Sequence, residues 1–159
     1  MQIVLFEPEI PPNTGNIARL CAATGTVLHL IEPLGFRLED RYLKRAGLDY
    51  WPNVTMHVWK NWQAFIDRGE QHSHTRLVMV SSKKRAQSTP FHRFAFQKED
   101  CLVFGPETRG LPPAILAYSE FHIRVPMLPG GVRSINLATC AGIVLYLALD
   151  RVGIPEEWC

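Results

Sequence analysis

Three polar segments hold most of the side chains in this sequence that could do chemistry. They span residues 11–19, 105–111 and 125–137, and each follows an apolar, strand-like run. Their amides, arginine and glutamate can bind polar ligands and stabilise developing charge. In an α/β sheet, the loops that leave the carboxyl ends of strands are where ligands collect. The three segments therefore predict one composite site.

Taken singly, the second and third segments each allow two interpretations. Gly105 lets the backbone approach a ligand and Glu107 offers a carboxylate at the rim, but a plain turn with an exposed glutamate explains the same residues. In the third segment, the glycines at 130–131 either only connect two elements or wrap an adenine while Ser134 and Asn136 donate hydrogen bonds. Neither segment alone decides between binding and connection.

The common nucleotide and metal signatures are absent from the sequence. No Gly-x-Gly occurs, and the Walker-like spacing of Gly105 and Gly110 is followed by Leu111 instead of a lysine. No His-Glu-x-x-His motif appears, and His72 and His74 lie in a polar stretch that is typical of a solvated loop. We therefore expect no metal, and neither a dinucleotide-binding nor a P-loop enzyme.

Apolar or β-branched runs alternate with helix-like segments, which is typical of a mostly parallel sheet with helices on both faces. The runs predict six strands, at residues 3–6, 27–31, 54–58, 77–81, 101–104 and 121–125. The predicted helices run from Asn13 or Thr14, as a capping residue, to Gly25, over 39–46, from Asn61 to Gly69, and from Pro112–Pro113 onward. Residues 83–93 form the one long polar connection.

The last predicted helix, over about residues 135–152, is apolar nearly all round. Such a helix has to be covered on both sides, and a chain of 159 residues supplies one side from its own core. We therefore expect a homodimer in which a second copy covers the other side. The alternative is a central helix wrapped entirely by its own chain.

Length and composition indicate one soluble domain over residues 1–159, since 47% hydrophobic residues suffice for a core. Cys21, Cys101 and Cys140 lie in apolar runs, and together with Cys159 they show no Cys-x-x-Cys spacing. They are expected to be buried free thiols of a reducing compartment. Without a basic, apolar leader or an apolar stretch of about 20 residues, the protein is expected to be cytoplasmic and not membrane-bound.

A formal charge of +2 does not by itself indicate a nucleic-acid binder, so a polyanionic partner would need a local basic patch. Two groups of cations provide candidates, namely Arg41, Lys44 and Arg45 at helical spacing, and Lys83, Lys84 and Arg85 after a strand. Tyr50 and Trp51 beside the first group offer rings for stacking. A solvated charged face is the alternative interpretation.

In combination, the three segments resemble the motifs of the SPOUT-class RNA 2′-O-methyltransferases: Asn16 and Arg19, then Gly-Pro-Glu-x-x-Gly-Leu, then Pro-Met followed by Ser-x-Asn-Leu, in that order. Residues 7–17, 31–36 and 45–50 are similar, more narrowly, to the small tRNA methyltransferases that modify the wobble cytidine or uridine. The resemblance covers nearly the whole chain. It implies a C-terminal trefoil knot, S-adenosylmethionine as cofactor, tRNA as substrate and a homodimer.

The resemblance also implies roles for individual residues. Those that would bind the cofactor are Val80, Gly105, Glu107, Val125, Met127, Ser134 and Leu137. Arg19, with Asn16 and Asn136, would face the ribose, whose 2′-oxygen attacks the methyl group of a sulfonium. Because a guanidinium keeps its proton, Arg19 is expected to stabilise the nascent alkoxide electrostatically, the alternative being an ordinary helix-surface arginine.

Two departures from the family pattern fall in the third segment. Residues 128–134 form a loop one residue longer than expected, and Ala138 stands where a serine is usual. Two other functions stay open at this point: methylation of ribosomal or another RNA, and a catalytically silent dimeric RNA-binding module.

Overall fold

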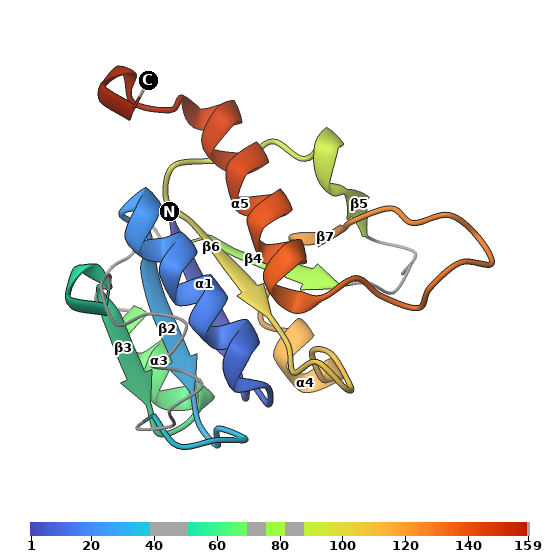
Figure 1. Ribbon diagram of the computed structural model, residues 1–159. Coiled ribbons are helices and arrows are strands. Elements are labelled where there is room, and N and C mark those ends of the chain that lie inside the picture. Colours follow the sequence, from blue (N-terminus) through green and yellow to red (C-terminus); the bar gives the residue numbers. More distant parts are fainter. Residues whose placement is uncertain (39–50, 70–75, 82–87, 159) are drawn as a thin grey trace.

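The computed structural model describes residues 1–38, 51–69, 76–81 and 88–158. Its centre is a seven-stranded sheet in the order β3-β2-β1-β6-β4-β7-β5, with every pair of neighbours parallel (Figure 1). The strands are β1 (Gln2–Phe6), β2 (Val27–Ile31), β3 (Met56–Trp59), β4 (Arg76–Ser81), β5 (Thr89–Pro90), β6 (Asp100–Phe104) and β7 (His122–Arg124). Because all strands run the same way, their carboxyl ends lie at one edge of the fold.

The parallel α/β arrangement agrees with the sequence prediction, but the predicted number of strands was wrong. Each of the six predicted runs contains a strand, and the seventh is β5, within the segment predicted as a polar connection. β5 has two residues and pairs with β7 through Thr89 and Ile123. A strand that short carries no periodicity, so no sequence pattern could reveal it.

Helices cover both faces of the sheet, as predicted. α1 (Pro11–Thr24) and α5 (Leu137–Val152) lie side by side on one face, in front of the sheet in Figure 1. α3 (Trp62–Gly69) and the four-residue α4 (Pro113–Leu116) belong to the hydrophobic cluster on the other face. Short 3-10 turns occur at η1 (Trp51–Asn53), η2 (Phe91–Arg93) and η3 (Glu156–Trp158).

The first helix begins earlier than predicted. Ile10 is its N-cap and makes no side-chain cap hydrogen bond, so neither Asn13 nor Thr14 is the capping residue. Prolines at the first helical positions set the backbone angle and lack the N–H that a cap would satisfy, which explains why this helix begins without one. Its end is as predicted, because Gly25 adopts the left-handed conformation with φ 61°.

The other predicted helix boundaries fit more closely. Asn61 Oδ1 accepts a hydrogen bond from Ala64 N at 2.9 Å and so caps α3. Pro112 precedes α4 as expected, and α5 begins at Leu137 with Asn136 as its cap. The helix predicted at 39–46 lies outside the described residues.

The amino end of the sheet is closed by a buried ion pair. Arg76 and Asp100 are the first residues of β4 and β6, and Arg76 Nε donates to Asp100 Oδ1 at 2.6 Å. A second bond runs from the Arg76 guanidinium to Oδ2 at 2.8 Å, and Gln97 N donates to the same oxygen at 2.9 Å. The guanidinium also stacks over Phe94 and Phe121. The Asp100 side chain is fully buried.

Cys21, Cys101 and Cys140 are free thiols, as predicted. The first two are buried and Cys140 is half-buried. Burial raises the pKa of Cys21 and of Cys101 to about 12 and that of Cys140 to about 11. Thiols with such pKa values are poor nucleophiles at neutral pH, which fits a packing role.

Among the residues that the structure describes, none of the helices has both the length and the apolar character needed to cross a bilayer.

Candidate functional site

The three polar segments of the sequence meet at the carboxyl end of the sheet. Glu107, from the loop after β6, accepts hydrogen bonds from the loop between β1 and α1. Its Oε2 accepts from Glu9 N at 2.9 Å, and its Oε1 accepts from Ile10 N at 3.3 Å and from Asn13 Nδ2 at 3.0 Å. The carboxylate therefore ties the second segment to the first.

Asn13 extends this network to the third segment. Its Oδ1 accepts a hydrogen bond from Asn136 Nδ2 at 2.8 Å. The Asn136 Oδ1 in turn accepts from Ala138 N at 2.9 Å and Thr139 N at 3.2 Å, and so caps α5. Because a carboxylate only accepts, Glu107 fixes which way the Asn13 amide points, and Asn13 then fixes Asn136. We name the chain Glu107–Asn13–Asn136 the amide network.

Sequence reasoning assigned the wrong role to Asn13. The residue was considered as a helix cap, but its side chain is buried and bridges the two other segments. The available signal was the pair of prolines at 11–12, which make a side-chain cap unnecessary and leave the amide for another partner.

A second set of contacts joins the same two loops nearby. Thr108 donates to the Glu9 carboxylate through its N, at 3.1 Å, and through its Oγ1, at 2.8 Å. Arg109 pairs with Glu7 and approaches Glu9 at 3.7 Å. These bonds hold the loop after β6 against the loop after β1, and they keep Glu107 in register with Asn13.

Gly105 is needed for a reason other than the expected one. A Cβ atom at this position would lie 2.3 Å from Leu111 N and 2.4 Å from Gly110 C. The backbone that approaches Gly105 is therefore the chain's own, folded back by the bond from Gly110 N to Pro106 O at 2.8 Å. A larger residue would force this turn open.

Three of the predicted cofactor residues lie on or beside the central strands. Val80, near the end of β4, pairs with Phe104 of β6 on one side and with Ile123 of β7 on the other. It therefore lies between the starts of the second and third segments. Val125 and Leu137 pack against the same hydrophobic core as Val80.

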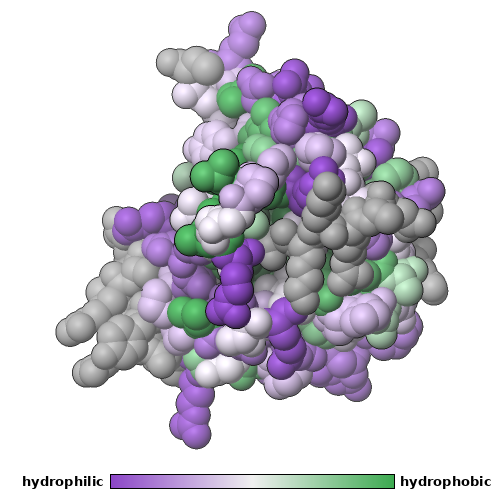
Figure 2. Space-filling view, turned by 90° about the vertical axis from the view of Figure 1, so that its right-hand side faces the viewer, coloured by the Kyte–Doolittle hydropathy of each residue, from purple (hydrophilic) through white to green (hydrophobic). Residues whose placement is uncertain are grey.

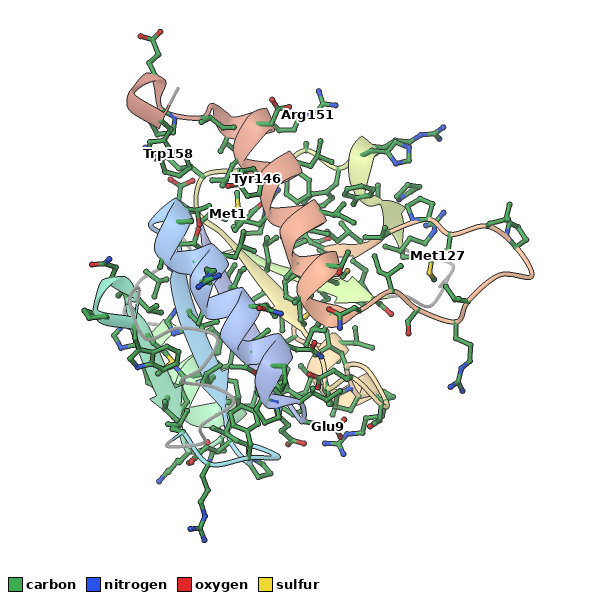
Figure 3. All side chains as sticks on the ribbon, in the orientation of Figure 1. Met1, Glu9, Met127, Tyr146, Arg151 and Trp158 are labelled. Atoms are coloured by element: carbon green, nitrogen blue, oxygen red, sulfur yellow. The ribbon has the colours of Figure 1, made fainter. Side chains whose placement is uncertain are left out.

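The remaining predicted cofactor residues, Met127 and Ser134, lie on the loop between β7 and α5. This loop projects from the body of the domain, and Met127 lies on it well apart from Glu9 (Figures 1 and 3). Ser134 is exposed. Gly131 N donates to Leu128 O at 3.1 Å, and Gly130, with φ 79°, completes this turn.

Leu128 and Val132 flank that turn and are 81% and 69% exposed. Figure 2 views the side toward which the loop projects and shows apolar residues exposed among polar ones. The loop that carries Met127 and Ser134 therefore presents two large apolar side chains to its surroundings.

Arg19 and Asn16 lie three residues apart on α1, and both are exposed. Arg19 follows Asn13 by six residues, about 9 Å along the helix axis. The same helix thus carries the buried amide of the network and two exposed polar groups.

The predicted RNA-binding residues, Arg41, Lys44, Arg45, Lys83, Lys84 and Arg85, lie outside the described residues, as do His72 and His74. Within the described ranges, no group of three or more histidines, cysteines or carboxylates is placed to hold a metal ion.

Comparison with known proteins identifies the family to which the chain belongs. The family model described as "SpoU rRNA Methylase family" matches residues 1–146. A tRNA (cytidine(34)-2′-O)-methyltransferase of Saccharophagus degradans is 53% identical over 156 residues, which cover 95% of each chain. The tRNA (cytidine(34)-2′-O)-methyltransferase of Escherichia coli K12 is 48% identical over 160 residues, covering 98% of this chain and 96% of the relative.

Solved structures agree. A structure described as giving structural insights into the 2-OH methylation of C/U34 on tRNA superposes with a TM-score of 0.86 at 43% identity, covering 94% of both chains. The SpoU methyltransferase AviRb of Streptomyces viridochromogenes, solved with AdoMet, shares the fold with a TM-score of 0.83 at 20% identity over 95% of this chain and 57% of its own. With the family model matching nearly the whole length and relatives near 50% identity, the chain belongs to the SpoU rRNA Methylase family.

Proposed function

We propose that this protein transfers a methyl group from S-adenosylmethionine to the ribose 2′-oxygen of the wobble cytidine or uridine of tRNA. The observation that carries the proposal is the amide network, which joins three loops at the carboxyl end of the sheet. It does so in a chain whose relatives at 48–53% identity are named for this reaction at cytidine 34.

The residues present fit the proposed cofactor. The ends of β6, β4 and β7 lie side by side, so Gly105, Val80 and Val125 form one wall. The exposed apolar side chains beside the turn at 130–131 suit the faces of an adenine, and Ser134 offers a hydroxyl. When bound, S-adenosylmethionine supplies a methyl group activated by a positively charged sulfur. Met127 and Leu137 complete the proposed cofactor set, which Glu107 supports by holding its loop in place.

The chain's own residues would align and stabilise the attacking oxygen. With the cofactor bound, the 2′-oxygen would take the methyl group, a neutral thioether would be the leaving group, and the hydroxyl proton would pass to a neighbouring group or a phosphate. Arg19 stabilises the negative charge that grows on the 2′-oxygen. Asn16 and Asn136 orient the ribose, and Asn136 is itself held by Asn13 at 2.8 Å.

The architecture around this site completes the proposal. We infer a single domain over residues 1–159, cytoplasmic, with its C-terminal segment threaded through a loop as a trefoil knot. On α5, Tyr146 (Figure 3) is 48% exposed and Ile143 is 41% exposed, which supports a homodimer formed through this helix. Tyr146→Glu is expected to yield a monomer in sedimentation equilibrium, and a variant that stays dimeric would contradict this interface.

The proposed tRNA contacts are the two basic groups predicted from the sequence, Arg41, Lys44 and Arg45 with Lys83, Lys84 and Arg85. Each phosphate contact would release counterions, so tRNA binding should weaken steeply with salt. The reaction is expected to need no metal ion and to persist in a chelator.

Methyl transfer is tested with labelled S-adenosylmethionine and total tRNA from cells that lack the protein. We expect label in a tRNA fraction, mapped to the 2′-oxygen of nucleotide 34. Label in ribosomal RNA alone would favour a different RNA substrate. Cofactor binding without label in any RNA would favour a silent RNA-binding module.

A further inference from the structure

A groove with a volume of about 610 Å³ opens at the carboxyl ends of β2 and β3. Apolar side chains, among them Leu34 and Phe36, line it together with Glu32, Arg37 and Lys60. It includes most of the 31–36 stretch that the proposed function leaves without a role. Its volume lies within the range of roughly 300–1,000 Å³ that is usual for ligand sites.

The groove is built against the same short loop as the candidate site. Gly35 N donates to Pro8 O at 2.9 Å, and a Cβ atom at Gly35 would lie 2.8 Å from Glu9 Cα. Glu9 N in turn donates to Glu107 at 2.9 Å. Residues 8–9 therefore link the 32–38 segment, which lines the groove, to Glu107 of the candidate site.

The chemistry of the lining points to one class of ligand. Phe36 is half-buried beside the apolar residues Leu34 and Leu38, and Arg37 and Lys60 are exposed. Two cations against the single carboxylate of Glu32 favour an anion. An aromatic ring next to cations is how proteins bind single-stranded nucleic acid, with the base stacked and the phosphate paired.

We infer that this groove binds an unpaired nucleotide of the RNA substrate that lies within two positions of the methylated one. Its base stacks on Phe36, and Arg37 and Lys60 bind its phosphates. The inference rests on the proposed function, because residues 8–9 link the groove to the amide network, beside which the ribose is proposed to bind.

The test uses a synthetic RNA stem-loop and its abasic derivatives, each lacking one base at the two positions on either side of the methylated nucleotide. Dissociation constants are measured by fluorescence anisotropy. For the unmodified protein, one abasic derivative should bind about tenfold more weakly. For Phe36→Ala, the intact RNA should show the same loss, and removal of that base should add nothing further. Phe36→Leu, which keeps an apolar side chain without a ring, serves if the alanine variant does not fold.

The cations are tested by the salt dependence of binding. In Arg37→Gln/Lys60→Gln, the slope of log K against log salt should fall by about 2. Lys98→Gln is the matched control. Lys98 is an exposed lysine just before β6, at the amino end of the strands, which is opposite to the groove. An equal change in the control, or additive losses from Phe36→Ala and every abasic substitution, would overturn the inference.

The two proposals fail separately in this design. Methyl transfer that is absent while binding depends on Phe36 would refute the proposed function and support the groove. Normal methyl transfer with binding that is indifferent to Phe36, Arg37 and Lys60 would refute the groove and leave the proposed function in place.

Discussion

Among the residues that the structure describes, a carboxylate at each end of the sheet accepts hydrogen bonds from three donors. The two carboxylates differ in how far along the sequence those donors lie. At the amino end, Asp100 is bound by Arg76, 24 residues away, and by Gln97, three residues away. At the carboxyl end, Glu107 is bound by Glu9, Ile10 and Asn13, which are 98, 97 and 94 residues away. Asp100 is fully buried, whereas Glu107 is half-buried.

We interpret this difference as one between a stabilising site and the proposed functional site. Asp100 is fully buried and two aromatic rings cover the Arg76 guanidinium, so we expect this pair to act on the free energy of unfolding. The amide network exists only once remote segments have folded together, and it ends at the exposed Asn136. Substitutions at the amino end should therefore cost stability, and those at the carboxyl end should cost catalysis.

The largest expected effect is on stability, at the amino end. Asp100→Asn leaves the Arg76 guanidinium without its carboxylate in a buried place, so the free energy of unfolding should fall by about 3 kcal/mol. Urea unfolding followed by circular dichroism measures it. Glu99→Gln, which alters the exposed neighbouring carboxylate, should change the value by less than about 0.5 kcal/mol. A loss of methyl transfer in folded Asp100→Asn would break the separation between the two ends.

The next effect is on turnover, at the carboxyl end. Arg19→Ala should lower kcat by about 10²–10³-fold while leaving the Kd of S-adenosylmethionine nearly unchanged, because the guanidinium is proposed to act on charge that develops only in the transition state. Single-turnover kinetics and isothermal titration calorimetry give the two quantities. If both fall equally, Arg19 belongs to cofactor binding instead.

Glu107→Gln tests the amide network at the carboxyl end of the sheet. The new amide places its NH2 group either against Glu9 N, which removes one hydrogen bond, or against Ile10 N and Asn13 Nδ2, which removes two. The free energy of unfolding should fall by only about 1 kcal/mol, because Glu107 is half-buried. The kcat should fall roughly tenfold to 100-fold, because Asn136 loses its orientation. Glu120→Gln, at an exposed carboxylate outside the network, is the control for both measurements. A larger loss of stability than in Asp100→Asn would refute the distinction.

The last prediction concerns an effect that is absent at neutral pH and arises from the buried interior at the amino end. Burial raises the pKa of Cys101 from 9.0 to about 12, so the unfolded thiol loses its proton first and the folded state loses stability between pH 9 and 12. At pH 7 the thiol keeps its proton in both the folded and the unfolded state, so the stability does not depend on this ionisation there. The slope of the unfolding free energy against pH above 9 should be shallower in Cys101→Ala than in the unaltered protein, and identical slopes would contradict the raised pKa.

Much of the fold followed from the sequence because its strands are continuous apolar runs. The strands from β1 to β7 other than β5 were predicted, since a parallel strand covered on both faces shows such a run. β5 was not predicted, because a strand of two residues shows no hydrophobic pattern. The side of the sheet that carries the three segments followed from chain direction alone, which is why their convergence could be expected.

The hydrogen bonds and close contacts between the segments of the site could not be predicted from one sequence. The bond from Asn136 to Asn13 spans 123 residues, and no local preference encodes a partner that far away. The crowding at Gly105 depends on the return of the backbone at Gly110–Leu111, which only coordinates reveal. In both cases, tertiary contact determines the role of a residue whose local sequence suggests another one.

Asn136 also explains how the third segment can tolerate a change of length. Its side chain both caps α5 and bonds to Asn13, so the helix is anchored downstream of residues 128–134. An added residue in that projecting stretch is absorbed before the anchor, and the rotation of α5 about its own axis stays the same. An insertion just after Asn136 would instead turn the helix by about 100° and carry its exposed apolar stripe away from any partner.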